Sequence, residues 1–178
     1  MDPSGPLRKS YPVEIFTRSF KIGGHLEPLG HLMDALNNPD RDSLLIRQGT
    51  VSSLSANGPL NSFTLEEIVL NKSDVFFICL TDKEDHSELN LLKRAEKMIV
   101  YLPLFVIRAN FHLGGETRFR DMLDTLPGTF LPITDAAIFP LFVSRVAVPG
   151  HRDLLLINKK QITLYHPEKS QAQSLSLQ

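Results

Sequence analysis

The chain has 178 residues, of which 42% are apolar and 22% charged, and its formal net charge is −1. This length is enough for one ordinary domain or two small ones, and the balanced charge excludes a general attraction to nucleic acid or anionic membranes. Cys79 is the only cysteine, which excludes an internal disulfide. The sequence has neither a signal-peptide pattern nor an apolar run near the roughly 20 residues of a membrane span. We therefore expect a cytoplasmic protein without membrane insertion.

Residues 1–10 are expected to be a disordered start, followed by a first unit at 11–82. Its opening segments, 13–20 and 21–26, alternate apolar and polar side chains and are rich in β-branched and aromatic residues, which predicts two strands. A short helix follows and ends before Pro39. Its apolar side chains have the spacing of one helical face and are Leu29, Leu32, Met33 and Leu36.

The first unit continues with strands at 43–46 and 50–54 and is expected to close with a hairpin. In that hairpin, 67–70 turns at Asn71 into 75–80, because asparagine tolerates the left-handed backbone of a tight turn. The unit therefore reads as strand, strand, helix, strand, strand and hairpin.

The closing strand at 75–80 has no polar alternation, so both of its faces should be covered. One face can pack on its own unit, whereas the other needs the second unit, the linker or another chain. We therefore predict that Phe76 and Phe77 point to opposite sides, one into the core of the first unit and one into an interface. Tyr165, in the corresponding strand at 162–165, completes the set of candidate interface residues.

Residues 83–98 are expected to form a linker helix. Asp85 and Glu88 have the spacing of a capping box at its start. The apolar seam of this helix would consist of Leu91, Ala95 and Met98. The charged side chains between them would face solvent.

A second unit at 99–167 repeats the first at a constant offset of 87 residues, and a disordered tail is expected at 168–178. Apolar periodicity matches along the whole unit, and identities coincide, as in the Asn-Lys pairs at 71–72 and 158–159. The second helix has its apolar positions at Phe119, Met122, Leu123 and Leu126. The repeat predicts an α+β fold, predominantly antiparallel β, made by tandem duplication of a β-β-α-β-β-hairpin unit with a linker helix. We expect the two copies to pack with pseudo-two-fold symmetry.

The second unit contains three short motifs, RDMLD at 120–124, FLPITDA at 130–136 and LINKKQI at 156–162. Together they resemble a small bacterial β-rich domain family of unknown function. The first unit keeps the Asn-Lys pair of the last motif but has LLIRQG at 44–49 where a threonine and an aspartate would stand. The resemblance implies a bacterial β-rich module and transfers no catalytic residues.

Two further fragments resemble ligand-binding domains. The opening strands carry the pattern V-x-I…I-x-G-x-L and are similar to the first motif of Sm-like RNA-binding barrels, although Phe111 replaces Gly24 in the second unit. The segment 53–58 is similar to a turn of PilZ domains, which bind cyclic di-GMP. It departs from that turn at Ser53, where an aspartate or asparagine belongs, and in the spacing of the upstream arginines.

Catalytic patterns are missing from the sequence. It has no Gly-x-Ser-x-Gly elbow and no Gly-x-x-x-x-Gly-Lys-Ser/Thr phosphate loop. Cys79 stands among apolar neighbours, as a buried and inert thiol does. His25 and His112 are equivalent in the two units and would bind a metal only by meeting across a two-fold axis. We predict no catalytic, cofactor-binding or metal-binding residues and no cofactor.

The expected function is non-enzymatic protein–protein binding or assembly in a bacterial cell, with a protein partner or as a homo-oligomer. The alternative is a regulatory domain that binds nucleic acid or a nucleotide such as a cyclic dinucleotide. Tight binding to nucleic acid is not expected, because it depends on several basic contacts with phosphates and the sequence has no basic run longer than two residues.

Overall fold

The computed structural model describes residues 8–168, and this part of the chain forms one antiparallel sheet of ten strands with few helices. The strands of the first half are β1 (Tyr11–Thr17), β2 (Phe20–Leu26), β3 (Ser43–Ser53), β4 (Phe63–Asn71) and β5 (Val75–Leu80). Those of the second half are β6 (Arg94–Tyr101), β7 (Phe105–Leu113), β8 (Phe130–Pro140), β9 (His151–Asn158) and β10 (Leu164–Pro167). The helices are α1 (Leu32–Asn37) and α2 (Phe119–Thr125), and the 3₁₀ turns are η1 (Lys72–Asp74), η2 (Glu84–Glu88) and η3 (Lys159–Gln161). The prediction of a β-rich, antiparallel protein is confirmed.

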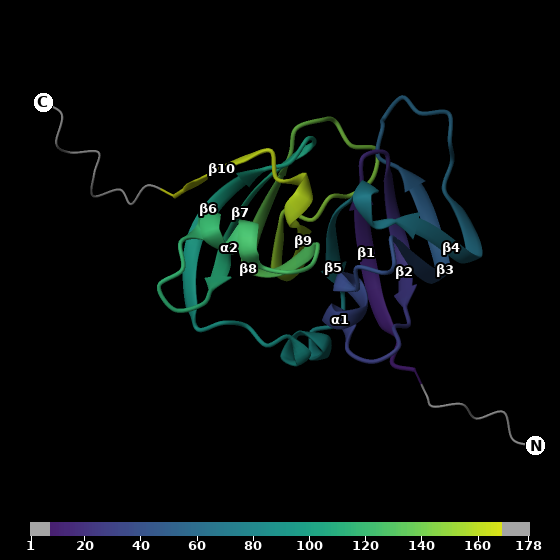
Figure 1. The fold of residues 1–178 in the computed structure, drawn as a ribbon. Helices are drawn as coiled ribbons and strands as arrows, with labels where there is room; N and C mark the ends of the chain where they lie inside the picture. The colour runs from purple at the N-terminus through teal and green to yellow at the C-terminus, as the bar shows by residue number, and fades with distance from the viewer. Residues whose placement is uncertain (1–7, 169–178) are drawn as a thin grey trace, which may run out of the picture.

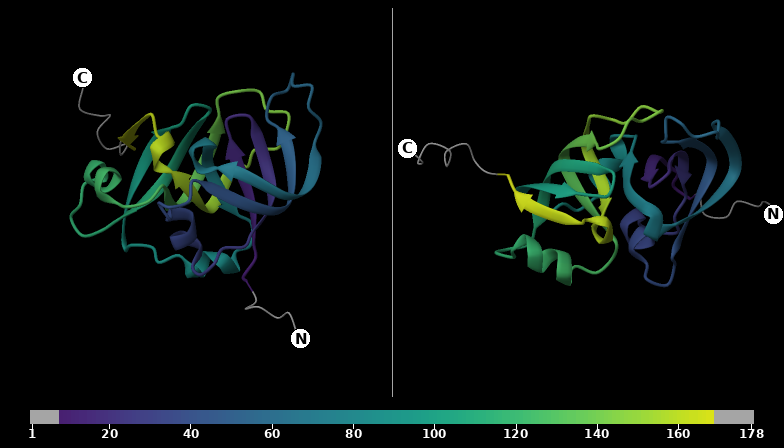
Figure 2. Two further views of the ribbon diagram at one scale, coloured as in Figure 1. Left: turned by 45° about the vertical axis from the view of Figure 1, so that its right-hand side comes forward. Right: turned by 90° about the horizontal axis from the view of Figure 1, so that it is seen from above.

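Neighbouring strands of the sheet lie in the order β10-β6-β7-β8-β9-β5-β1-β2-β3-β4. The first half, in purple to blue, lies beside the second half, in green to yellow (Figure 1). The strands of each half curve around a separate centre, as the view from above shows (Figure 2). Alternation along the strands fills the two interiors, with Ile15 and Ile46 in the first core and Val100 and Ile107 in the second.

The same order of elements occurs twice along the chain. It runs β1-β2-α1-β3-β4-η1-β5 in the first half and β6-β7-α2-β8-β9-η3-β10 in the second. From the short helices onward, residues that differ by 87 in number occupy corresponding places: Leu36 lies in α1 and Leu123 in α2, while Asn71 ends β4 and Asn158 ends β9. In the first two strands of each half the difference is 85, because Ile15 pairs with Ile22 as Val100 pairs with Ile107. None of the helices within residues 8–168 is long and apolar enough to cross a membrane.

One lysine in each half holds the end of the short helix. Lys72 Nζ donates hydrogen bonds to the carbonyl oxygens of Ala35 and Asn38, at 3.5 and 3.1 Å. Lys159, 87 residues later, donates from its Nζ to the carbonyl of Leu123 at 3.0 Å and also to that of Leu126. Burial lowers the pKa of both lysines. A cation at a helix C-terminus satisfies carbonyls that have no partner within the helix.

The expected hairpins at the end of each half are wrong. β4 pairs with β3, and β5 pairs with β1 and β9, so that β4 and β5 are not neighbours in the sheet. The turn η1 carries the chain from one edge of the first half to the other. β9 and β10 are likewise separated, by η3. Each asparagine therefore does end a strand, as predicted, but the turn that follows leads the chain to the other edge of its half instead of forming a hairpin.

The expected linker helix at 83–98 is also wrong. Only the short turn η2 forms, and β6 already begins at Arg94, in register with β7. Met98 and Val100 point into the second core with a period of two, and pairing with β7 satisfies the backbone that a helix would have satisfied internally. Asp85, expected as a cap, is buried and forms an ion pair with Lys9 at 2.8 Å. The disordered ends predicted at 1–10 and 168–178 lie, apart from residues 8–10 and 168, outside the described residues.

The two halves do not meet as a pseudo-two-fold pair. They meet where β5 of the first half pairs with β9 of the second, Phe77 opposite Ile157 and Ile78 opposite Leu156. A two-fold axis repeats every contact reciprocally, so the pairing of β5 with β9 would require their counterparts β10 and β4 to pair as well, and these two strands lie at opposite ends of the sheet. The arrangement is head to tail.

Candidate functional site

The junction between the halves is formed by two strands that are buried on both faces. All six residues of β5 are at most 2% exposed. Phe77 and Cys79 face the second core, and Ile78 and Leu80 face the first. β5 therefore belongs to both cores, and the prediction that both its faces are covered is confirmed.

Phe76 and Phe77 do not point to opposite sides as expected. The pairing of β1 with β5 shifts at this point, since Phe16 lies opposite Phe77 but Thr17 lies opposite Val75. A bulge of this kind places an extra residue in one strand and re-aims its side chain. Both phenyl rings therefore lie edge-on to Phe105 of the second half, with ring centroids 5.9 Å from Phe76 and 5.1 Å from Phe77. Both residues belong to the second core.

β9 completes the junction, and the sequence analysis did not assign it this role. Leu154 and Leu156 lie in the first core, and Leu155 and Ile157 lie in the second. Four consecutive apolar residues without alternation were the available signal, because a strand covered on both sides reads in this way. The expected two-faced strand of the second half, 162–165, instead lies at the edge of the sheet.

Asn158 ties the end of β9 to the start of β5. It is fully buried, and its Nδ2 donates to the carbonyl oxygens of Lys72 and Val75 at 3.1 and 2.8 Å. Its Oδ1 accepts a hydrogen bond from the backbone N–H of Lys160 at 3.0 Å. Gln161 adds a further link, since its Nε2 donates to the carbonyl of Ser73.

An ion pair spans the junction on the other side. Arg152 of β9 donates to Glu14 of β1 at 2.8 Å, and Lys21 of β2 also pairs with Glu14. Partial burial pushes the pKa of Glu14 upward, but the hydrogen bonds from Lys21 and Arg152 outweigh burial and hold the pKa below its ordinary value. The carboxylate is therefore stabilised in its charged form by cations from both halves.

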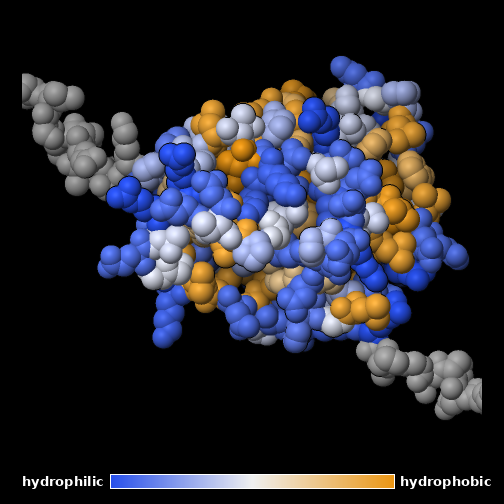
Figure 3. All heavy atoms as spheres, viewed as in Figure 1, coloured by the Kyte–Doolittle hydropathy of each residue, from blue (hydrophilic) through white to orange (hydrophobic). Residues whose placement is uncertain are grey.

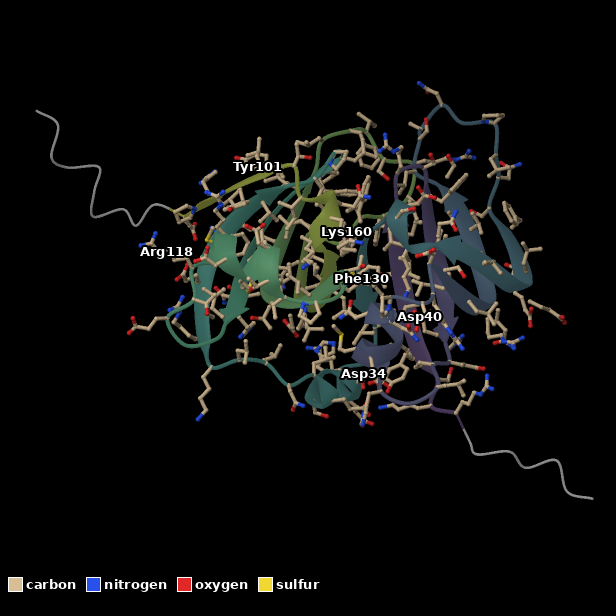
Figure 4. The ribbon with its side chains drawn as sticks, viewed as in Figure 1. Asp34, Asp40, Tyr101, Arg118, Phe130 and Lys160 are labelled. Atoms are coloured by element: carbon tan, nitrogen blue, oxygen red, sulfur yellow. The ribbon has the colours of Figure 1, made fainter. Side chains whose placement is uncertain are left out.

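Asn37, at the end of α1, makes a third polar link. Its Oδ1 accepts hydrogen bonds from the backbone N–H groups of Thr129 and Phe130, both at 2.8 Å, and its Nδ2 donates to the carbonyl of Phe130 at 3.0 Å. Gly128 has a φ of +93°, and a Cβ there would lie 2.5 Å from Asn37 Cγ, so this approach requires glycine. Phe130 and Lys160 lie in the middle of the molecule, between the halves (Figure 4).

The two outer strands of the sheet, β4 and β10, have one paired edge each within residues 8–168. Val69 of β4 is 71% exposed and Leu164 of β10 is 52% exposed. Phe63 and Leu65 of β4 are exposed as well. Apolar side chains gather on the surface over β3 and β4, at the right-hand side of Figure 3. An exposed edge with apolar side chains is a template for another strand.

Tyr165, predicted as an interface residue, lies in β10. Its ring lies edge-on to Phe119 of α2, with centroids 4.7 Å apart, and the side chain is half-buried against the second core. It is therefore far from Phe76 and Phe77 in the sheet order, with β6, β7, β8 and β9 between β10 and β5.

Within the part of the chain that the structure describes, the thiol and the histidines considered as catalytic or ligating groups are not brought together. Burial raises the pKa of the Cys79 thiol to about 12, which leaves it uncharged at neutral pH. Histidines 25 and 112 lie in β2 and β7, which are separated by four other strands. Residues 8–168 contain no group of three His, Cys, Asp or Glu side chains placed to hold a metal ion.

A cleft of about 600 Å³ opens where η1 and η3 meet the ends of the helices. Its charged lining consists of Arg41, Asp42, Lys72, Lys159 and Lys160. Cations outnumber acids in this lining, although Lys72 and Lys159 already donate to helix carbonyls. The sequence has no basic run longer than two residues, but the fold brings basic side chains from both halves together in this cleft.

No family model matches the chain, and neither a curated protein nor a solved structure matches it.

Proposed function

We propose that this chain is a non-enzymatic protein-binding or assembly module of a bacterial cell, built by tandem duplication of one α+β unit. The observation that carries the proposal is the edge strand β4, which presents Leu65 and Val69 to solvent beside backbone groups without a strand neighbour among the described residues. A partner that adds a strand there would gain backbone hydrogen bonds and cover the apolar side chains.

The same edge-to-edge pairing already joins the two halves of this chain. β5 and β9 meet over only two directly paired positions, and the side chains on both faces supply the buried area. We assign Phe76 and Phe77 to that internal junction and Tyr165 to the external surface. A non-enzymatic role is supported by the burial of the single thiol.

The test is affinity capture from a nuclease-treated extract of the source cells. The wild-type chain is compared with a variant that carries Leu65→Lys and Val69→Lys. The matched control is Val143→Lys, because Val143 is 82% exposed and lies outside the strands. We expect the wild type and the control to retain the same proteins and the edge variant to lose them. Identical captured sets for all three chains would refute the proposal.

A second candidate function rests on the cleft with Arg41, Lys72, Lys159 and Lys160. Such a lining favours an anionic ligand, either a nucleotide or the backbone of a nucleic acid. Calorimetric titration with a cyclic dinucleotide and with a short single-stranded RNA tests this candidate. Binding of either ligand should be lost in a variant with Arg41→Gln and Lys160→Gln, and the absence of binding to the wild type would rule the candidate out.

A further inference from the structure

The two strands of the internal junction have counterparts at the two ends of the sheet. In the repeated order of elements, β9 corresponds to β4 and β5 corresponds to β10. β9 and β5 pair with each other at the junction. β4 and β10 are the outer strands of the sheet. The molecule therefore carries one half of the junction at each end, a β4 edge at one and a β10 edge at the other.

The apolar contacts of the junction have counterparts at these edges. An offset of 87 residues converts the pair Ile78 and Leu156 into Tyr165 and Val69, and the pair Phe77 and Ile157 into Leu164 and Leu70. All four converted residues are apolar or aromatic.

The exposure of these residues depends on which of the two cores they face. Ile157 and Ile78 face the core of their own half, and their counterparts Leu70 and Tyr165 pack partly on their own cores. Leu156 and Phe77 instead face the core of the other half and are fully buried. Their counterparts are the side chains that lie open: Val69 is 71% exposed and Leu164 is 52% exposed. Val69 and Leu164 are exposed because no neighbouring half covers them, as the other half covers Leu156 and Phe77 at the junction.

Two of the polar links, those of Asn158 and Gln161, keep polar counterparts at the edges. Asn158 corresponds to Asn71, an exposed asparagine at the same end of β4. The link from Gln161 to Ser73 converts into Asp74 and Lys160, which carry opposite charges. Glu14 lies opposite Cys79, and Ile99 lies opposite His166, which stands 87 residues after Cys79. The ion pair of Glu14 with Arg152 therefore converts into Ile99 and Leu65, so an ionic pair is replaced by an apolar one. Asn37 converts into Asp124, but Gly128, whose lack of a side chain permits the approach of Asn37, converts into Arg41, so this link has no counterpart at the edges.

We propose that the partner of this module is a second copy of the same chain, bound head to tail, with β10 of one molecule paired to β4 of the next. Val69 then packs against Tyr165, Leu70 lies opposite Leu164, and Asp74 faces Lys160 across the contact. This inference rests on the proposed assembly function and on the duplication. Because the contact joins unlike edges, it repeats at each molecule and yields a closed ring or a filament instead of a two-fold dimer.

Two edge variants of the purified full-length chain test the proposal. Val69→Lys damages only the β4 edge, and Leu164→Lys damages only the β10 edge. Both positions are more than half exposed, so the fold should survive, which circular dichroism and thermal melting check. Val143→Lys is the control, with a side chain 82% exposed outside the sheet. Sedimentation velocity over a wide concentration range gives the size of the particles.

The wild type and the control should form particles larger than a dimer, and each edge variant alone should be monomeric. An equimolar mixture of the two variants should form a one-to-one dimer and stop there, since it has one intact β10 edge and one intact β4 edge. A wild type that stays monomeric, or variants that fail to combine, would overturn the proposal. So would assembly that only one of the variants abolishes, because that result means a like-with-like contact.

Cysteine cross-linking tests the register. Chains with Tyr165→Cys and chains with Val69→Cys are mixed under oxidation, and buried Cys79 does not compete. We expect a disulfide dimer with this pair. The dimer should be lost when Leu65→Cys replaces Val69→Cys, because Leu65 lies on the same face of β4 but four residues away along the strand. Equal yields for both positions would show random collision and refute the register.

The outcome is separable from that of the proposed function. If the purified chain is monomeric while extract capture still depends on the β4 edge, self-assembly is wrong and the protein-binding role stands. If neither experiment depends on the edge, both proposals fall.

Discussion

Arg152 of β9 hydrogen-bonds to Glu14 of β1 at 2.8 Å, although β5 lies between their strands. The guanidinium therefore reaches across a whole strand, above Cys79, to join the two halves. Lys21 approaches the same carboxylate from β2. This three-residue cluster is ionic, unlike the links that Asn158 and Asn37 make across the junction, and it makes part of the stability of the fold dependent on pH.

Glu14→Gln should destabilise the protein at neutral pH. Hydrogen bonds to charged groups contribute about 1.5–3 kcal/mol, and partial exposure of this cluster reduces the expected loss to about 1 kcal/mol. Because the folded-state pKa of Glu14 lies below its ordinary 4.5, the contribution is complete above that pH and disappears as the pH falls through the folded-state pKa. Urea denaturation of both chains across the acidic range should show the difference closing. A difference that stays constant to low pH would contradict the role of the charge.

Phe77→Ala and Phe76→Ala should both unfold the protein more easily, by about 3–5 kcal/mol each. The reason is that the bulge in β5 places both rings against Phe105 in one closed aromatic cluster. Phe139→Ala is the control, since that ring is 52% exposed. Thermal melting should rank the two junction variants together and the control near the wild type. A neutral result for either junction variant would mean that its ring is not packed there.

Asn158→Ala and Asn71→Ala form a matched pair at corresponding positions. The first removes a buried side chain that donates to two carbonyls and accepts from Lys160, and it should cost about 2–3 kcal/mol because those carbonyls are left without a donor. The second removes an exposed side chain and should change the stability of the monomer by less than about 0.5 kcal/mol. Chemical denaturation at low protein concentration measures both.

Cys79 should be unreactive in the native protein. Its side chain is fully buried and burial raises its pKa to about 12, so neither access nor thiolate is available to an alkylating reagent. The rate of iodoacetamide labelling should rise with urea in step with unfolding of the junction. Rapid labelling without denaturant would show that β5 opens locally.

The strands and short helices of this fold could be predicted because their signals are local. Val13 and Ile15 stand on either side of the polar Glu14 with the period of a strand, and the apolar stripe around Leu36 has helical spacing. The helix expected at 83–98 is wrong because the spacing of Leu91, Ala95 and Met98 fits a helical seam, whereas Met98 and Val100 also fit the period of two of a strand, in which Ala95 lies on the exposed face. Only the position of β7 decides between them, and that position is not local information.

The junction could be predicted from the sequence only in part. The unbroken apolar run of β5 indicated a strand covered on both faces, and this proved right. Which strand would cover it was not encoded nearby, since β9 lies in the other half of the chain. The bulge that turns Phe76 and Phe77 to the same side also has no sequence signature, because it arises from the register with β1.

Because β5 and β9 are shared between two cores, neither core can be completed until both halves have been synthesised. During synthesis the first half leaves the ribosome long before Leu154 and Leu156 exist, and those two side chains complete its interior. Until then β5 has one uncovered edge and one uncovered face, a condition that favours wrong pairing and calls for chaperones. Folding should therefore be slow, as expected of distant strand pairing, and should finish in a single late step in which both halves become native together.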